Sequence, residues 1–179
     1  MKRNIPILII IAIFAIILLA GCSQATTTTT VDAVASASVV DNAAAFEKAI
    51  SKEGSWIIAT TKDILIDKEI VLDGDFKNGK KDSAGNELYQ RKIGLYTQDS
   101  SFKVTNRFTL TAQKLTINSI NTSVEHGTFK GDLYIAAENF KLIDAIVEGN
   151  VYFLSDEIKA TFSMDSTSKI TGVQEVKAG

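Results

Sequence analysis

The stretch GDLYIAAENFKL, residues 131–142, is followed by GNVYFLSDEIKA, residues 149–160, and this repeat decides the expected fold. A glycine, a tyrosine and a lysine coincide in the alignment. Five apolar pairs coincide as well: Leu133 with Val151, Ile135 with Phe153, Phe140 with Ile158, Leu142 with Ala160, and Ile146 with Met164. A unit of this length cannot bury its apolar face alone, whereas stacked units form a continuous core. The repeat therefore predicts a β-solenoid in which aligned residues stack directly, about 4.8 Å apart.

A similar pattern extends toward the N-terminus at a longer spacing. Phe108, Leu110, Ala112, Leu115 and Ile117 align in order with residues 133, 135, 137, 140 and 142. We expect the additional residues of this longer unit to form an insertion within residues 121–128. An antiparallel sandwich would show the same alternation of apolar residues, but the coincidence over two faces of the repeat favours the solenoid.

Residues 43–52 are predicted to form one short helix. Asp41 or Asn42 can cap its N-terminus, and Gly54 offers a C-terminal stop. Phe46, Ala49 and Ile50 would share one narrow apolar face. The helix is too short to be stable alone, so we expect it to pack on the rest of the domain.

After Gly54 the apolar residues alternate with polar ones, which is typical of strands. The alternating pairs are Ile64 and Ile66, Ile70 and Leu72, Ile93 and Leu95, Phe102 and Val104, Phe108 and Leu110, and Leu115 and Ile117. Segments rich in Asp, Asn, Gly, Ser and Thr separate these pairs and predict turns. No helical pattern lies between the strands, so the expected class is mainly β.

The N-terminus has the three parts of a secretory leader. Lys2 and Arg3 carry positive charge, and residues 5–20 are uncharged and dominated by Ile and Leu. This apolar run is shorter than the roughly 20 residues that a membrane-spanning helix needs. The following Leu19-Ala20-Gly21-Cys22 looks like the bacterial lipobox, a resemblance that implies cleavage between Gly21 and Cys22 and lipid on Cys22. Residues 1–21 are then a signal peptide, and the lipid places the protein on the extracytoplasmic side of the cell membrane.

The composition of the remaining chain predicts a tether followed by one domain, and it limits the kinds of partner. Residues 22–40 are rich in Thr, Ser and Ala and lack a usable period, so we expect a lipidated cysteine followed by a disordered tether. Residues 41–179 would be the solenoid domain. The chain has 19 basic and 21 acidic residues, and two of the basic ones lie in the leader. Such a balance argues against a nucleic-acid partner, which would need a basic surface.

The repeats resemble a known group of proteins. The segments GDLYIAAENFKL and GNVYFLSDEIK are similar to the repeats of bactofilin-type, polymer-forming β-helical proteins. AFEKAI at residues 45–50, WIIAT at 56–60 and DILIDKEIVLDG at 63–74 resemble the helix-capped entry of pectin-lyase-like β-helices. The resemblance covers about residues 43–177. It implies a right-handed parallel β-helix of about five coils, whose N-terminal end is covered by the short helix.

Catalytic and metal-binding patterns are sparse, so no catalytic residue, metal or cofactor is expected. His126 is the only histidine, and we expect it on a surface loop within the insertion. Asp73 and Asp75 flank Gly74, and Asp132 would stack on Asn150. Paired carboxylates can bind calcium or carry out acid–base chemistry, but the same residues are ordinary turn formers.

Two groups of residues are candidates for ligand binding. The segment 76–92 forms a basic loop on an acidic chain, able to touch anionic polymers or lipid headgroups; its candidate residues are Lys77, Lys80, Lys81, Tyr89, Arg91 and Lys92. Tyr134 and Tyr152 would stack one coil apart and offer a platform for a sugar ring. Lys141 and Lys159 would stack in the same way.

These patterns favour a membrane-anchored, non-enzymatic module for binding or scaffolding at the cell envelope. Its partners would be the membrane, through Cys22, and a cell-wall glycan or an envelope protein. One alternative is a self-associating, polymer-forming β-helix, because solenoid ends expose strand edges. Another is a small calcium-dependent polysaccharide lyase or hydrolase.

Overall fold

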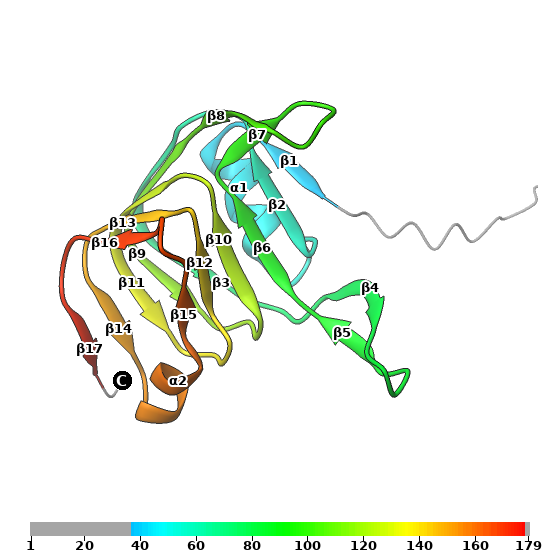
Figure 1. Cartoon of the computed structure of the whole chain (residues 1–179). Helices are drawn as coiled ribbons and strands as arrows, with labels where there is room; N and C mark the ends of the chain where they lie inside the picture. Colours follow the sequence, from blue (N-terminus) through cyan, green and yellow to red (C-terminus); the bar gives the residue numbers. More distant parts are fainter. Residues whose placement is uncertain (1–36, 178–179) are drawn as a thin grey trace, which may run out of the picture. The chain divides into compact units, whose positions relative to one another are not determined.

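The structure is a computed structural model that describes residues 37–177 (Figure 1). The predicted signal peptide, the predicted lipidation site Cys22 and most of the predicted tether lie outside the described residues. Within this range the fold is mainly β, as the alternating sequence predicts, and its two large sheets are parallel.

The chain passes back and forth between these two sheets. Sheet A has the strand order β1 (Ser38–Val40), β2 (Ile57–Thr60), β6 (Arg91–Gly94), β10 (Thr122–Glu125), β12 (Lys141–Ile143) and β15 (Ser163–Met164). Sheet B begins with β3 (Ile64–Leu72), β9 (Thr109–Ile117) and β11 (Thr128–Ile135). It continues with β13 (Ile146–Glu148) and β14 (Val151–Phe153), and then with β16 (Lys169–Ile170) and β17 (Gln174–Val176). Each strand of sheet A after β1 is therefore followed along the chain by strands of sheet B.

Within the described range, two antiparallel hairpins interrupt this course, one on each side of β6 in the chain. The first joins β4 (Lys77–Lys81) to β5 (Glu87–Tyr89), and the second joins β7 (Tyr96–Gln98) to β8 (Val104–Arg107). Figure 1 shows the first hairpin projecting away from the body of the domain and the second at its opposite end. Because of these hairpins, the partners β2 and β6, and likewise β6 and β10, lie further apart in sequence than the partners β10 and β12.

The repeat of residues 131–142 in residues 149–160 is confirmed where β11 pairs with β14. Leu133 lies opposite Val151, Tyr134 opposite Tyr152 and Ile135 opposite Phe153, all in parallel register. The first and last of these pairs are buried in the core between the sheets. Fully burying one such side chain contributes about 1.5–3 kcal/mol, so the inward residues of successive strands provide most of the stabilisation.

The longer spacing expected upstream is wrong. Leu115 and Ile117 pair with Leu133 and Ile135, and these pairs have the same sequence interval as Leu133 and Val151 downstream. No insertion occupies residues 121–128, because β10 lies there and all four of its residues are buried. Three of the four are polar or charged, so their hydropathy does not mark the segment as a strand.

Downstream, an unexpected helix shifts the register. Helix α2 (Asp156–Thr161) begins after Ser155, whose side chain accepts a hydrogen bond from the backbone N–H of Ile158. Met164 rather than Ala160 therefore lies opposite Leu142, and Lys169 rather than Met164 lies opposite Ile146. Of the five aligned apolar pairs, only the two within β11 and β14 are strand pairs.

The predicted N-terminal helix is present as α1 (Ala43–Ile50), two residues shorter than expected. Asn42 caps it through its side chain, and its apolar residues Phe46, Ala49 and Ile50 are buried against β1, β2 and β3. The tether was expected to run through residue 40, but its last three residues form β1, which pairs with β2.

Phe102 and Val104, one of the predicted alternating apolar pairs, do not face the core between the two large sheets. Phe102 is 80% exposed and has a φ of 62°, in the turn between β7 and β8. Val104 begins β8 and is half-buried. The alternation therefore indicates a strand here correctly, but the strand belongs to a hairpin that pairs with itself rather than with the two large sheets.

Candidate ligand-binding face

The outward side chains of sheet A form two rows that cross the strands. In one row Ile57, Lys92, Ser123, Lys141 and Ser163 are register partners; in the other, Val39, Ala59, Gly94, Glu125 and Ile143 are. The residues between them, such as Ile58, Ile93, Val124 and Leu142, are buried in the core. Since side chains alternate across a strand, both rows lie on the outer face of the sheet.

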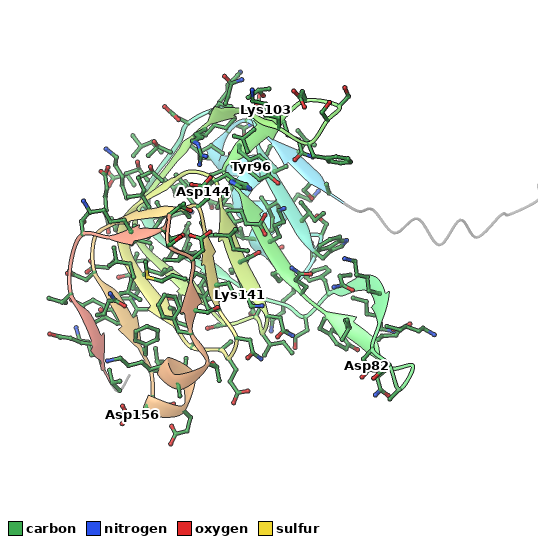
Figure 2. The ribbon with its side chains drawn as sticks, viewed as in Figure 1. Asp82, Tyr96, Lys103, Lys141, Asp144 and Asp156 are labelled. Atoms are coloured by element: carbon green, nitrogen blue, oxygen red, sulfur yellow. The ribbon has the colours of Figure 1, made fainter. Side chains whose placement is uncertain are left out.

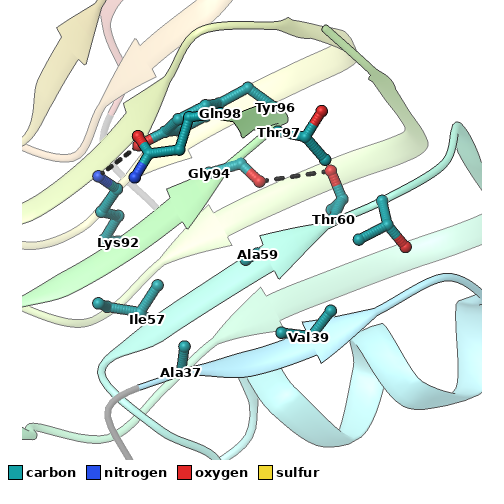
Figure 3. A pocket seen from close by; sticks show the side chains of 11 residues that line it. Ala37, Val39, Ile57, Ala59, Thr60, Lys92, Gly94, Tyr96, Thr97 and Gln98 are labelled. Carbon is teal, nitrogen blue, oxygen red and sulfur yellow. Dashed lines mark hydrogen bonds between the residues drawn. The ribbon is translucent and has the colours of Figure 1, made fainter. Parts of the chain in front are cut away.

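The first hollow on this face has a volume of about 380 Å³. We call it the Tyr96 hollow; it is lined by residues 37, 39, 57, 59–61, 92, 94 and 96–98 (Figure 3). Its aliphatic side consists of Val39, Ile57 and Ala59, and Tyr96 lies close to Gly94. A Cβ atom at Gly94 would lie 3.1 Å from Cε1 of Tyr96, so the small residue lets the ring lie close to the sheet.

A charged network holds one side of this hollow in place. The Nζ of Lys92 donates a hydrogen bond to the hydroxyl of Tyr96 at 3.0 Å and forms a salt bridge with Glu125. Ser123 donates to the same carboxylate at 2.8 Å. Burial lowers the pKa of Lys92, but the hydrogen bonds to Glu125 and Tyr96 outweigh burial and raise that pKa above its ordinary value. Lys92 is therefore a charged group fixed by its partners.

A second chain of contacts supports Tyr96 from the other side. The rings of Tyr96 and His126 meet edge to face, with centroids 4.5 Å apart. Nδ1 of His126 lies 3.0 Å from the carboxylate of Asp144, which also contacts Arg107. Hydrogen bonds from Arg107 and then from His126 lower the pKa of Asp144. His126 is thus half-buried in the short turn between β10 and β11, not on the surface loop of an insertion.

The second hollow lies at the base of the first hairpin and has a volume of about 310 Å³. We call it the Lys141 hollow; it is lined by residues 78, 88–90, 121, 123, 141 and 143. Ser123 lines this hollow and is the register partner of Lys92, which lines the Tyr96 hollow. The two hollows are therefore neighbours on the face of sheet A.

The structure separates the surface residues of the predicted basic loop into three parts. Lys77, Lys80 and Lys81 lie on β4 of the projecting hairpin, where Lys77 forms a salt bridge with Glu87. Figure 2 labels Asp82, which follows these lysines at the hairpin tip. Tyr89 lines the Lys141 hollow, and Lys92 lines the Tyr96 hollow.

Arg91 does not belong to any exposed surface, which corrects its place among the ligand-binding candidates. It is the first residue of β6 and shares the inward face with Ile93, so its side chain is fully buried. Its guanidinium donates to the backbone carbonyls of Ala49, Asp73 and Gly74 and lies over the ring of Phe76. Burial lowers the pKa of Arg91 to about 10, so the group stays charged at neutral pH.

The tyrosine stack exists, but lysines cover it. The ring centroids of Tyr134 and Tyr152 lie 4.8 Å apart on sheet B. The Nζ of Lys177 lies 4.6 Å from the centroid of Tyr152, and that of Lys114 lies 5.2 Å from the centroid of Tyr134. These cation–π contacts occupy the rings that a sugar would need. The expected stack of Lys141 on Lys159 is wrong, because Lys141 pairs with Ser163.

Two of the carboxylates considered for calcium have structural partners. Asp73 forms a salt bridge with Lys52 at 3.4 Å, and the side-chain amide of Asn150 donates to Asp132 at 3.0 Å. Residues 37–177 contain no group of three or more His, Cys, Asp or Glu side chains that could hold a metal ion.

Comparison of the chain with models of protein families, with curated proteins and with solved structures gives no match. Of the helices in the described range, none has the length and apolar character to cross a membrane.

Proposed function

We propose that this chain is a lipid-anchored envelope protein whose domain is a right-handed parallel β-helix of about five coils that binds an extended glycan along sheet A. The β-helix is supported by parallel pairs that share one sequence interval, such as Ser123 with Lys141, Phe129 with Val147 and Leu133 with Val151. Parallel strands joined by a crossover connection almost always have the right-handed sense. The leader and Leu19-Ala20-Gly21-Cys22 support the lipid anchor.

The Tyr96 hollow is the observation that carries the binding function. It combines an aliphatic floor with one aromatic wall, and Lys92, Thr97 and Gln98 add polar groups at its edge. Ligand sites typically join an apolar surface to a few polar groups that fix orientation. A sugar ring has an apolar face and hydroxyl groups at its edge, and so fits this combination. The contacts of Tyr96 with Lys92 and His126 hold the wall in position before any ligand arrives.

Binding to cell-wall material tests this function. The purified full chain, kept in detergent, should sediment with peptidoglycan, and Tyr96→Ala should weaken binding about tenfold if the ring is a central contact. Tyr134→Ala removes the same side chain from sheet B and serves as the matched control. Equal binding by the two variants would remove the Tyr96 hollow from the proposal.

The anchor has its own test. Cys22→Ser should leave the protein unprocessed or release it from membranes, because multiple acyl chains on one cysteine provide stable attachment. A Cys22→Ser protein that is processed and retained like the wild type contradicts the lipoprotein proposal.

Self-association is the second candidate because β1 is an edge strand. Within residues 37–177, β1 pairs only with β2, and its Val39 is 69% exposed. Unpaired strand edges can add another chain. Sedimentation velocity of the full chain should then show oligomers that grow with concentration and disappear in Val39→Lys.

A further inference from the structure

Among the described residues, no acid neutralises the cation of the Lys141 hollow. Lys92 and Lys141 lie in the same outward row, with Ser123 between them. Lys92 forms a salt bridge with Glu125, whereas Lys141 forms none within residues 37–177 and its side chain is exposed. Figure 2 labels Lys141 on this side of the domain. In this part of the chain, the row therefore has one compensated and one uncompensated positive charge.

Polar groups beside Lys141 are held in fixed orientations. Asn121 donates from Nδ2 to the backbone carbonyl of Tyr89 at 2.9 Å, and Asn78 donates from Nδ2 to Oε1 of Gln90 at 3.0 Å. Within residues 37–177, the Oδ1 of Asn121 and the Nε2 of Gln90 make no hydrogen bond. One oriented acceptor and one oriented donor thus remain for a ligand beside the charge of Lys141.

Apolar side chains complete the same hollow. Leu88 and Tyr89, which are each 39% exposed, come from β5 of the first hairpin. Ile143 contributes from β12. Together with the amides and the cation, they match the groups of a sugar ring that bears an acid: an apolar face, hydroxyl groups and one negative charge.

We propose that the Lys141 hollow is a subsite for the acidic unit of an anionic glycan, with Lys141 paired to its carboxylate or phosphate. Asn121 and Gln90 then hydrogen-bond the hydroxyl groups of that unit, and Tyr89 packs on the ring. This proposal rests on the proposed glycan-binding function and adds the charge of the ligand. The Tyr96 hollow takes a neighbouring unit of the same chain, because the two hollows share the face of sheet A.

The lysines of the first hairpin strengthen this preference at longer range. Lys80 and Lys81 are exposed on β4, the strand that contributes Asn78 to the hollow. Charges within a Debye length of about 10 Å of the ligand attract it without contact at moderate salt. Binding of the acidic glycan should therefore weaken as ionic strength rises, while binding of a neutral glycan should not.

Calorimetric titration of the full chain in detergent tests the subsite. The probes are a galacturonic acid oligomer, a phosphate-bearing teichoic acid fragment and a neutral N-acetylglucosamine oligomer. Lys141→Gln should weaken binding of an acidic probe about fivefold, as loss of one exposed ion pair requires, and Lys141→Arg should restore it. Lys169→Gln makes the same charge change on sheet B, where Lys169 is exposed, and should have no effect.

The outcomes separate this subsite from the general binding function. Preference for the uronate or for the teichoic fragment identifies the acid as carboxylate or phosphate. Unchanged binding of both acidic probes by Lys141→Gln, with loss in Tyr96→Ala, overturns the subsite but leaves the glycan-binding function intact. Failure of every probe to bind a wild-type chain that still sediments with peptidoglycan overturns the subsite alone, and failure of the chain to bind the probes and peptidoglycan overturns both.

Discussion

The Nη2 of Arg91 donates a hydrogen bond to the backbone carbonyl of Ala49 at 2.9 Å, so a buried charge from sheet A contacts the last turn of α1. The same guanidinium donates to the carbonyls of Asp73 and Gly74, which follow β3. A positive group near a helix C-terminus is also favoured by the helix dipole. One side chain therefore ties the N-terminal helix, sheet A and the end of β3 together.

Replacing Arg91 with alanine should cost about 3 kcal/mol of unfolding free energy, because buried carbonyl groups lose their donor and a cavity remains. Urea unfolding followed by circular dichroism measures this loss. Arg107→Ala removes a more exposed arginine and should cost about 1 kcal/mol or less. Similar losses in the two variants would show that Arg91 does not have this structural role.

Engineered cysteines test the proposed stacking in a Cys22→Ser background. Lys130→Cys with Glu148→Cys should form a disulfide on mild oxidation, because these residues are register partners about 4.8 Å apart. Lys141→Cys with Ser163→Cys should do the same. Lys141→Cys with Lys159→Cys has the same sequence spacing as the first pair but should stay reduced, since α2 moves Lys159 out of the strand. Mass spectrometry after alkylation reads out all three, and a disulfide in the last pair would contradict the register.

Gly149→Ala should destabilise the domain strongly because the backbone of β11 approaches too closely there for a side chain. A Cβ atom at Gly149 would lie 2.0 Å from the carbonyl oxygen of Gly131 in β11. Overpacking of this kind costs about 1–3 kcal/mol, which a shift in thermal melting temperature reports. Gly79→Ala is the control; its φ of +78° is strained for alanine, but no atom lies within 4 Å of the added methyl. A smaller loss at Gly149 than at Gly79 would show that close approach is not the reason for the glycine.

The carboxylate of Asp165 should give the domain a stability that disappears in strong acid. The hydroxyl of Ser168 donates to it at 2.7 Å and is the largest cause that lowers the pKa of Asp165 to about 2; the hydroxyl of Thr167 adds to the effect. A lowered pKa in the folded state means that this contribution is present above the ordinary value of 3.8 and is lost as pH falls toward 2.

Ser168→Ala removes that main donor and should raise the pKa of Asp165, moving the acid-induced loss of stability to higher pH. Carbon-13 NMR of the side-chain carboxyl measures the pKa directly. Asp82, whose pKa is lowered by the hydrogen bond from the side-chain amide of Asn86 at the tip of the first hairpin, provides an internal reference that should not move. An unchanged Asp165 titration in Ser168→Ala would contradict the assigned cause.

The sequence predicts the strand pairing only where apolar residues mark both partners. Leu133 and Val151 are both apolar and both lie in strands, so their alignment leads directly to the observed pair. In β10, by contrast, buried Thr122, Ser123 and Glu125 are stabilised by hydrogen bonds and a salt bridge. The salt-bridge partner Lys92 comes from a distant segment. Because hydropathy carries no information on such a partner, it does not identify residues 122–125 as a buried strand.

The start of α2 could have been recognised from local residues. Ser155 followed by Asp156 and Glu157 is a typical helix N-terminus, with a capping hydroxyl and acids in the first turn. Residues 155–160 also align with the repeat, and that alignment obscured the helix N-terminus.

The candidate site could not be assembled from the sequence. Tyr89 and Lys92 were recognised as candidates because they belong to a basic segment, and both line hollows on sheet A. Tyr96 was missed, because no motif surrounds it and its partner His126 lies on a distant segment. The role of Lys141 was missed because its neighbours Asn78 and Asn121 come from a hairpin and a turn far from it in sequence.

The placement of both hairpins next to β6 has a consequence for how this protein can change. Strand β4 pairs with β5, and β7 pairs with β8, so neither hairpin contributes a strand to the two parallel sheets. Substitution of the hairpin residues that line the two hollows, such as Tyr89 and Tyr96, can therefore alter what the protein recognises while the parallel framework keeps folding as before. Selection on these hairpin residues can thus change specificity without changing the paired strands that stabilise the domain.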